Sequence, residues 1–149
     1  MIYIQKNIIV TSTCILLLMT LPACSSDDES LDITGRWNVE TYTILTEVND
    51  EVLNDETFQD AGIYTLNPDG SGTVTLNVPG LSLAPNTSIF WSLNNSGDVI
   101  TIDYRTGQEP FEYQLTVNSE NSLTWLYETF TDNNGVTSYF SATNRVVRE

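Results

Sequence analysis

From residue 33 to the end of the chain, apolar and polar residues alternate with a period of two. The clearest case lies at 110–118, where Phe111, Tyr113 and Leu115 alternate with Glu112 and Gln114. This period is typical of a β-strand that has one face on a core and the other in solvent. Similar patterns rich in β-branched residues predict eight strands, at about 36–46, 61–67, 72–78, 88–94, 98–105, 110–118, 122–131 and 136–147.

Turn-forming residues separate most of these strands. Asn67-Pro68-Asp69-Gly70 is suited to a tight turn, and 94–97 and 132–135 supply Asn and Gly for positive φ. Short connections favour an up-and-down meander, and eight antiparallel strands can close into a barrel that has no free edges. We therefore predict an all-β, eight-stranded antiparallel up-and-down β-barrel over residues 33–149. An open two-sheet β-sandwich is the alternative.

Two predicted connections are longer. In the acidic segment 47–60, Val52, Leu53 and Glu56 stand at helical spacing, which predicts one short helical turn in a solvated lid. The segment lacks the alternating acids and the glycine of a calcium loop. In 79–85, two prolines and a glycine exclude regular structure, and Leu81 and Leu83 either fold over the barrel mouth or contact a partner.

The N-terminus reads as a lipoprotein signal peptide over residues 1–23. Lys6 precedes an apolar stretch that is shorter than the ~20 residues of a spanning helix. Leu21-Pro22-Ala23-Cys24 resembles a bacterial lipobox, which implies that Cys24 is the lipid-attachment residue and that the partner it reaches is the membrane. The alternative is a plain cleaved signal with a chance cysteine.

The residues after Cys24 are serines and acids, and residues 24–32 are predicted to be a flexible acidic tether. They resemble the export signal of surface lipoproteins of Bacteroidetes, which implies an outer-membrane lipoprotein exposed on the cell surface. The alternative is a solvated tether with no export role. The residues of this predicted export signal are Ser25, Ser26, Asp27, Asp28 and Glu29.

Charge and composition remove several classes of function. After cleavage before Cys24, four arginines face 20 carboxylates, a net charge of −16, which repels nucleic acid. The chain has no histidine, and only Cys24 would remain as a cysteine, so zinc-thiolate sites and histidine bases are excluded. Asp103, Glu112 and Glu128 fall on outward faces, so no pair of carboxylates converges. We therefore expect no catalytic residue, no metal site and no cofactor.

Gly35-Arg36-Trp37 resembles the Gly-x-Trp signature of lipocalins. Together with the Asn-Pro-Asp-Gly hairpin, the strands at 90–94 and 98–102 and a last strand that ends in arginine, it makes residues 31–149 similar to the lipocalin-like lipoproteins of Bacteroidetes. The resemblance implies that Gly35 and Trp37 close the narrow end of the barrel. An arginine of the last strand, either Arg145 or Arg148, would stack on the indole.

Several aromatic residues fall on faces that we predict to point inward. One interpretation is a pocket for a small apolar, amphipathic or sugar-like ligand, and with Arg105 outward and an acidic surface we favour a neutral or cationic one. The other is a filled barrel that serves as an accessory or interaction subunit of a cell-surface protein complex. The candidate ligand-binding residues are Tyr64, Trp91, Tyr104, Tyr113, Trp125 and Tyr127.

Overall fold

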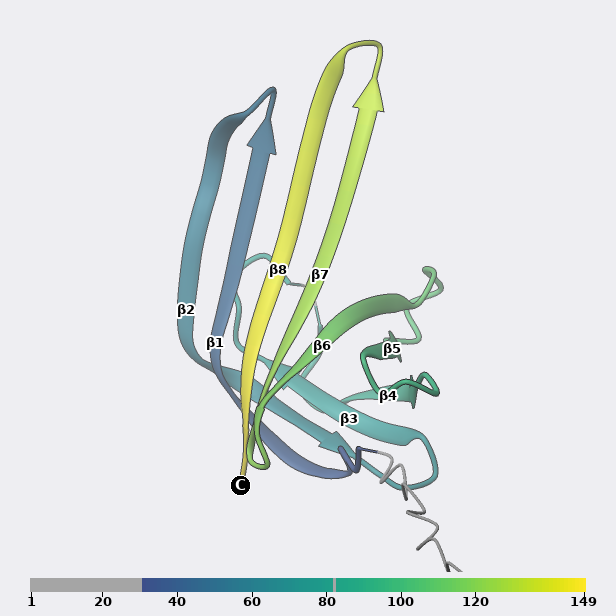
Figure 1. The fold of residues 1–149 in the computed structure, drawn as a ribbon. Helices are drawn as coiled ribbons and strands as arrows, with labels where there is room; N and C mark the ends of the chain where they lie inside the picture. Colours follow the sequence, from purple (N-terminus) through teal and green to yellow (C-terminus); the bar gives the residue numbers. More distant parts are fainter. Residues whose placement is uncertain (1–30, 82) are drawn as a thin grey trace, which may run out of the picture.

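The computed structural model describes residues 31–81 and 83–149 as a closed β-barrel (Figure 1). The predicted signal peptide (1–23), Cys24 and the predicted export signal Ser25–Glu29 lie outside the described residues. Eight antiparallel strands follow one another around the barrel, and the last pairs with the first, which confirms the predicted barrel over the open sandwich. The strands are β1 (Gly35–Val48), β2 (Glu51–Leu66), β3 (Ser71–Leu76), β4 (Thr87–Leu93), β5 (Val99–Asp103), β6 (Phe111–Ser119), β7 (Ser122–Asn133) and β8 (Val136–Arg148).

The acidic segment 47–60 is not the lid with a helical turn that the sequence suggested. It forms the end of β1, a two-residue turn and the first part of β2, with Val48 paired to Glu51. Asn49 and Asp50 both have positive φ, at 50° and 63°, as a two-residue hairpin turn of matching twist requires. Pairing with β1 along the whole segment supplies a ladder of hydrogen bonds that one isolated helical turn cannot match.

The strands differ greatly in length, and the long ones extend past the barrel. β1, β2, β7 and β8 have 14, 16, 12 and 13 residues, whereas β3 and β5 have 6 and 5. The ends of the long strands form a four-stranded projecting sheet in the order β2-β1-β8-β7, which we define as residues 44–58 and 127–142 (Figure 1). The two hairpins are joined near their tips, where Asn49 N–H donates to the Thr137 carbonyl at 2.9 Å.

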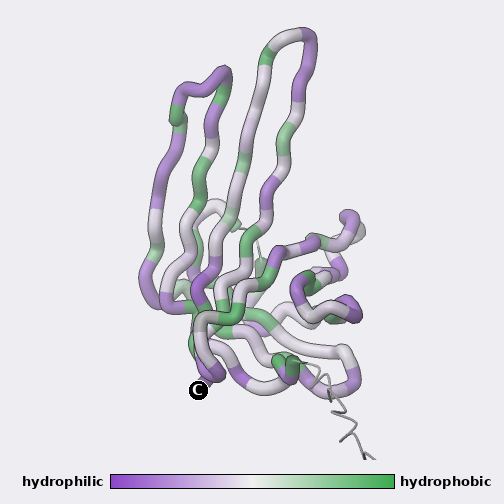
Figure 2. The backbone as a smooth tube through the Cα atoms, viewed as in Figure 1, coloured by the Kyte–Doolittle hydropathy of each residue, from purple (hydrophilic) through white to green (hydrophobic). Residues whose placement is uncertain are grey.

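Hydrophobic residues concentrate in the barrel, and hydrophilic positions follow most of the projecting part of β2 (Figure 2). The largest fully buried side chains include Trp37, Tyr64 and Trp125, which fill the barrel interior with the aliphatic residues around them. Among the described residues no helix is long and apolar enough to cross a membrane.

The closed end of the barrel is built around Trp37, which is 1% exposed. Its indole N–H donates to the Ile33 carbonyl at 2.8 Å, and the Arg148 guanidinium lies 4.7 Å from the ring centroid. Arg148 also donates to the Asp32 carbonyl at 2.7 Å, so one side chain stacks on the indole and ties down the incoming chain.

Two expectations at this end need correction. Arg145, the alternative stacking partner, lies outside the barrel in an exposed ion pair with Glu40, because the strand alternation turns it away from Trp37. The predicted tether also ends earlier than residue 32: Leu31 packs against the core, and the Asp32 side chain accepts hydrogen bonds from Thr34. Burial of the apolar side chains of Leu31 and Ile33 stabilises the packing of residues 31–33 against the barrel.

Candidate functional site

A cavity of about 490 Å³ opens at the end of the barrel opposite Trp37. This volume lies in the range of small-molecule sites. The described residues of its wall are mainly aromatic and aliphatic, with two polar side chains at the β5–β6 connection and no charged side chain among them. The lining residues are Tyr42, Leu76, Gly80, Leu81, Leu83, Tyr104, Thr106, Gln108, Phe111, Tyr113 and Phe140.

Three parts of the fold bring these residues together. Tyr42 and Phe140 stand on β1 and β8, where the barrel passes into the projecting sheet. Phe111 and Tyr113 come from β6, and Tyr104 directly follows β5. The third part is the connection between β3 and β4, where Gly80 has a φ of 86° and the chain turns so that Leu81 N–H donates to the Val78 carbonyl.

The aromatic rings of the cavity are continuous with the core beneath it. Phe111 lies at the centre, with ring centroids 5.6 Å from Tyr104 and 5.1 Å from Tyr127. Tyr113 connects this layer to Trp125, at 6.3 Å, and Trp125 lies 4.8 Å from Tyr64. Tilted and edge-on contacts of this kind stabilise one arrangement of the rings, so the cavity has a preformed wall.

A chain of tyrosine hydroxyls connects the cavity wall, which contains Tyr104 and Tyr113, to the fully buried Tyr64. The Tyr104 hydroxyl lies 2.9 Å from the Tyr64 hydroxyl and 2.9 Å from the Tyr113 hydroxyl. Burial raises the pKa of all three phenols well above the usual value, and their mutual electrostatic interactions add to the rise. The three therefore stay neutral over the physiological pH range and offer hydrogen bonds without charge.

Another polar group lies deeper in the barrel. Asn144 is fully buried on β8, paired in register with Trp125 of β7 and Tyr42 of β1. Neither its side-chain amide nor the Trp125 indole N–H has a hydrogen-bond partner among the described protein atoms. Buried polar groups are usually satisfied, so these three atoms, the Asn144 amide nitrogen and oxygen and the Trp125 indole nitrogen, are available to a polar atom that enters the interior.

The candidate residues predicted from the sequence occupy different places. Tyr104 and Tyr113 line the cavity, whereas Tyr64 and Trp125 lie beneath it as fully buried core. Tyr127 is half-buried and does not line the cavity, but its ring contacts two residues that do, Phe111 and Phe140.

Trp91, a ligand-contact candidate from the sequence, does not line this cavity but borders a smaller hollow of about 220 Å³ together with Phe90 and Pro110. Its indole N–H donates to the Asn67 and Ser71 carbonyls, at 3.2 and 3.0 Å, so it packs over the β2–β3 turn. Trp91 does lie on the same face of β4 as the buried Ile89, as the alternation predicts. The alternation along a strand shows which face a side chain is on, but it does not show where along the barrel axis that side chain lies.

Sequence reasoning missed Tyr42, Phe111 and Phe140 as site residues. Phe111 could have been predicted as a site residue, because it belongs to the same alternating run as Tyr113. Tyr42 and Phe140 enter the site only because β1 and β8 pair with each other, which places their sequence-distant ends on one wall.

Arg105 is exposed, as predicted, with its guanidinium 4.9 Å from the Phe90 ring on the outside of the barrel. No group of three or more His, Cys, Asp or Glu side chains suited to a metal ion lies in the described part of the chain. Comparison with protein-family models gives no match to this sequence, and comparison with curated proteins gives none either.

Proposed function

We propose that this protein is a non-catalytic binding module that takes a small, neutral, largely apolar ligand at the open end of its barrel. The observation that carries the proposal is the preformed cavity of about 490 Å³, whose wall contains five aromatic rings. Burial of apolar ligand surface against such a wall contributes about 25 cal/mol per Å².

The lining argues for a ligand without negative charge. No arginine or lysine lines the cavity, while the tyrosine hydroxyls, Thr106 and Gln108 offer neutral hydrogen bonds. An anion would have to lose its hydration without a compensating cation, inside a protein of net charge −15. A carboxylate should therefore bind more weakly than a neutral ligand of the same size and shape.

The test uses N-phenyl-1-naphthylamine, a neutral apolar fluorophore, in titrations of the purified protein. Thr106 is exposed at the rim, so Thr106→Trp should fill part of the cavity without disturbing the core. We expect saturable binding to the wild type and at least a tenfold weaker Kd for Thr106→Trp. The matched control is Phe90→Ala, which removes a half-exposed ring on the outer surface and should leave Kd unchanged.

Absence of saturation, or equal binding by Thr106→Trp, would refute a ligand site in this cavity. A fluorescent long-chain carboxylate tests the charge argument separately. Tighter binding of the carboxylate than of the neutral probe would keep the site but overturn its proposed neutral specificity.

We further propose that the barrel is held at the outer membrane by a lipid on Cys24 and is exposed on the cell surface. The lipobox-like Leu21–Cys24 and the acidic Ser25–Glu29 support this localisation. Cys24→Ser should release the protein from the membrane fraction, whereas the matched control Cys14→Ser, inside the predicted signal peptide, should not. If Cys24→Ser still sediments with membranes after a high-salt wash, the lipid anchor is wrong.

A further inference from the structure

Within the described part of the chain, no strand pairs with the outer edge of β7 in the projecting sheet. β6 pairs with β7 only as far as Leu126, and among the described residues Tyr127 to Asn133 pair with β8 alone (Figure 1). All six residues from 128 to 133 are exposed. One row of backbone N–H and C=O groups therefore faces solvent, and such an edge is a template for another strand.

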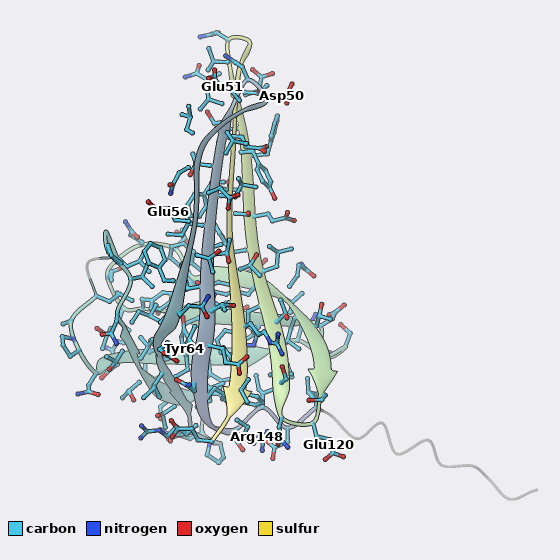
Figure 3. All side chains as sticks on the ribbon, turned by 90° about the vertical axis from the view of Figure 1, so that its left-hand side faces the viewer. Asp50, Glu51, Glu56, Tyr64, Glu120 and Arg148 are labelled. Atoms are coloured by element: carbon cyan, nitrogen blue, oxygen red, sulfur yellow. The ribbon has the colours of Figure 1, made fainter. Side chains whose placement is uncertain are left out.

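The opposite edge of the projecting sheet, on β2, is protected in ways that β7 is not. Within the projecting sheet, the β1–β2 ladder has a register shift between Thr46 and Glu47, so the β2 edge is irregular there. Three acids also lie on this part of β2: Glu51, Asp55 and Glu56 (Figure 3 labels Glu51 and Glu56). The β7–β8 ladder, in contrast, runs without a shift from Ser122 to Asn133. A bulge is a usual protection of an edge, and the β7 edge, which has fewer acids than the β2 edge, has none, so β7 is the edge left open to pairing.

Side chains on the open edge favour both β-structure and a contact. Phe130 is 64% exposed, and it shares a face with Glu128 and Asp132 by strand alternation. On the partner strand, Tyr139 is paired in register with Phe130 and donates a hydrogen bond to the Glu128 carboxylate. The exposed Phe130 ring, beside the half-buried Tyr139 and between two carboxylates, could therefore anchor a partner side chain in a charged surrounding.

Charge decides which kind of chain fits this edge. The projecting sheet has no lysine or arginine, and it carries the acids Glu47, Asp50, Glu51, Asp55, Glu56, Glu128 and Asp132. In an antiparallel pairing of two copies centred on Phe130, Glu128 of one copy would face Asp132 of the other. Like charges directly opposite each other are destabilising, so a second copy is a poor occupant.

We propose that the β7 edge from Glu128 to Asp132 is a docking site for an extended, basic segment of a partner protein, which adds to the projecting sheet as a further strand. Its lysines or arginines would face Glu128 and Asp132, and an apolar residue between them would pack on Phe130. This inference goes beyond the proposed ligand binding, because the edge lies outside the cavity wall.

The test is a selection of random twelve-residue displayed peptides on the purified full chain, followed by binding measurements on synthetic copies of the enriched peptides. The site variant combines Glu128→Gln, Phe130→Ser and Asp132→Asn. The matched control combines Glu109→Gln, Val117→Ser and Glu120→Gln, which likewise removes two carboxylates and one apolar side chain at exposed positions of the barrel body. Circular dichroism and urea unfolding verify that both variants fold.

We expect enriched peptides that alternate Lys or Arg with apolar or β-branched residues. Their binding should weaken at least tenfold in the site variant and stay unchanged in the control. Bound peptide should slow hydrogen exchange of the backbone amides at 128–132, which general electrostatic attraction would not do. Peptides that bind both variants equally, that are neutral or acidic, or that tolerate proline at every position would overturn the proposal. So would a dimer of the wild type that the site variant abolishes.

Discussion

At the scale of single residues, Trp37 and Arg148 stabilise the closed end of the barrel. Truncation of a fully buried indole removes its packing and leaves a cavity, so Trp37→Ala should lower the free energy of unfolding by about 3–5 kcal/mol. Arg148→Ala loses the stacking and the hydrogen bond to the Asp32 carbonyl, for which we expect about 1–2 kcal/mol. Arg145→Ala breaks only an exposed ion pair and should change stability by about 0–1 kcal/mol. Urea unfolding measures all three, and an Arg145 effect as large as that of Arg148 would contradict the assignment.

The stability of the barrel should also depend on Gly62, which lies very close to the backbone of β3. A Cβ atom there would lie 2.0 Å from the Thr75 carbonyl oxygen of the neighbouring strand, and φ is 143°. Gly62→Ala should therefore destabilise the barrel by at least about 3 kcal/mol, since backbone and not a flexible side chain must shift. The matched control is Gly107→Ala, where φ is also positive, at 80°, but no atom lies within 4 Å. Similar thermal midpoints for the two variants would show that the close approach of β2 and β3 is absent in solution.

At the scale of elements, the projecting sheet should be less protected at its edges than in its centre. β1 and β8 have a neighbour on both sides along nearly their whole length, whereas 51–58 of β2 and 127–133 of β7 have one. Amides of the two edge segments should exchange with solvent faster than those of 37–44 and 142–147. Native-state hydrogen exchange measures this order directly. Uniform protection across all four strands would mean that the edges are covered.

At the scale of the whole molecule, stability should depend on high pH through the buried phenols. Because burial raises the pKa of Tyr64, Tyr104 and Tyr113 in the folded state, their contribution is complete below the unfolded pKa of about 10. It is lost as pH rises above that value, by about 1.4 kcal/mol per phenol and pH unit. Urea unfolding at pH 8 to 11, with tyrosinate absorbance as a second signal, should show a plateau and then a steep decline. A constant free energy of unfolding up to pH 11 would contradict the buried hydroxyl chain.

The alternation along the chain was enough to predict the architecture of the described part. Period two in 110–118 and turn residues such as Asn67–Gly70 are local properties, and most of the strands follow from their own residues. The prediction of a helical turn at 52–56 was wrong because it rested on a local pattern alone. Three residues at helical spacing are a weak local signal, and pairing with β1 outweighs it.

The cavity could be predicted only in part. Alternation placed Tyr104, Tyr113 and Trp91 on inward faces, but only Tyr104 and Tyr113 line the cavity, because strand stagger decides the height at which a side chain meets the barrel axis. Closure of β1 against β8 added Tyr42 and Phe140, and it also selected Arg148 over Arg145. The sequence by itself determined the number and order of the strands and the face that residues of the alternating runs take, since both depend on neighbours along the chain; the strand at 51–60 is the exception, because pairing with β1 decided it. Only the tertiary structure decided which faces meet, how far the long hairpins project and which edge stays open, because these depend on register between residues far apart in sequence.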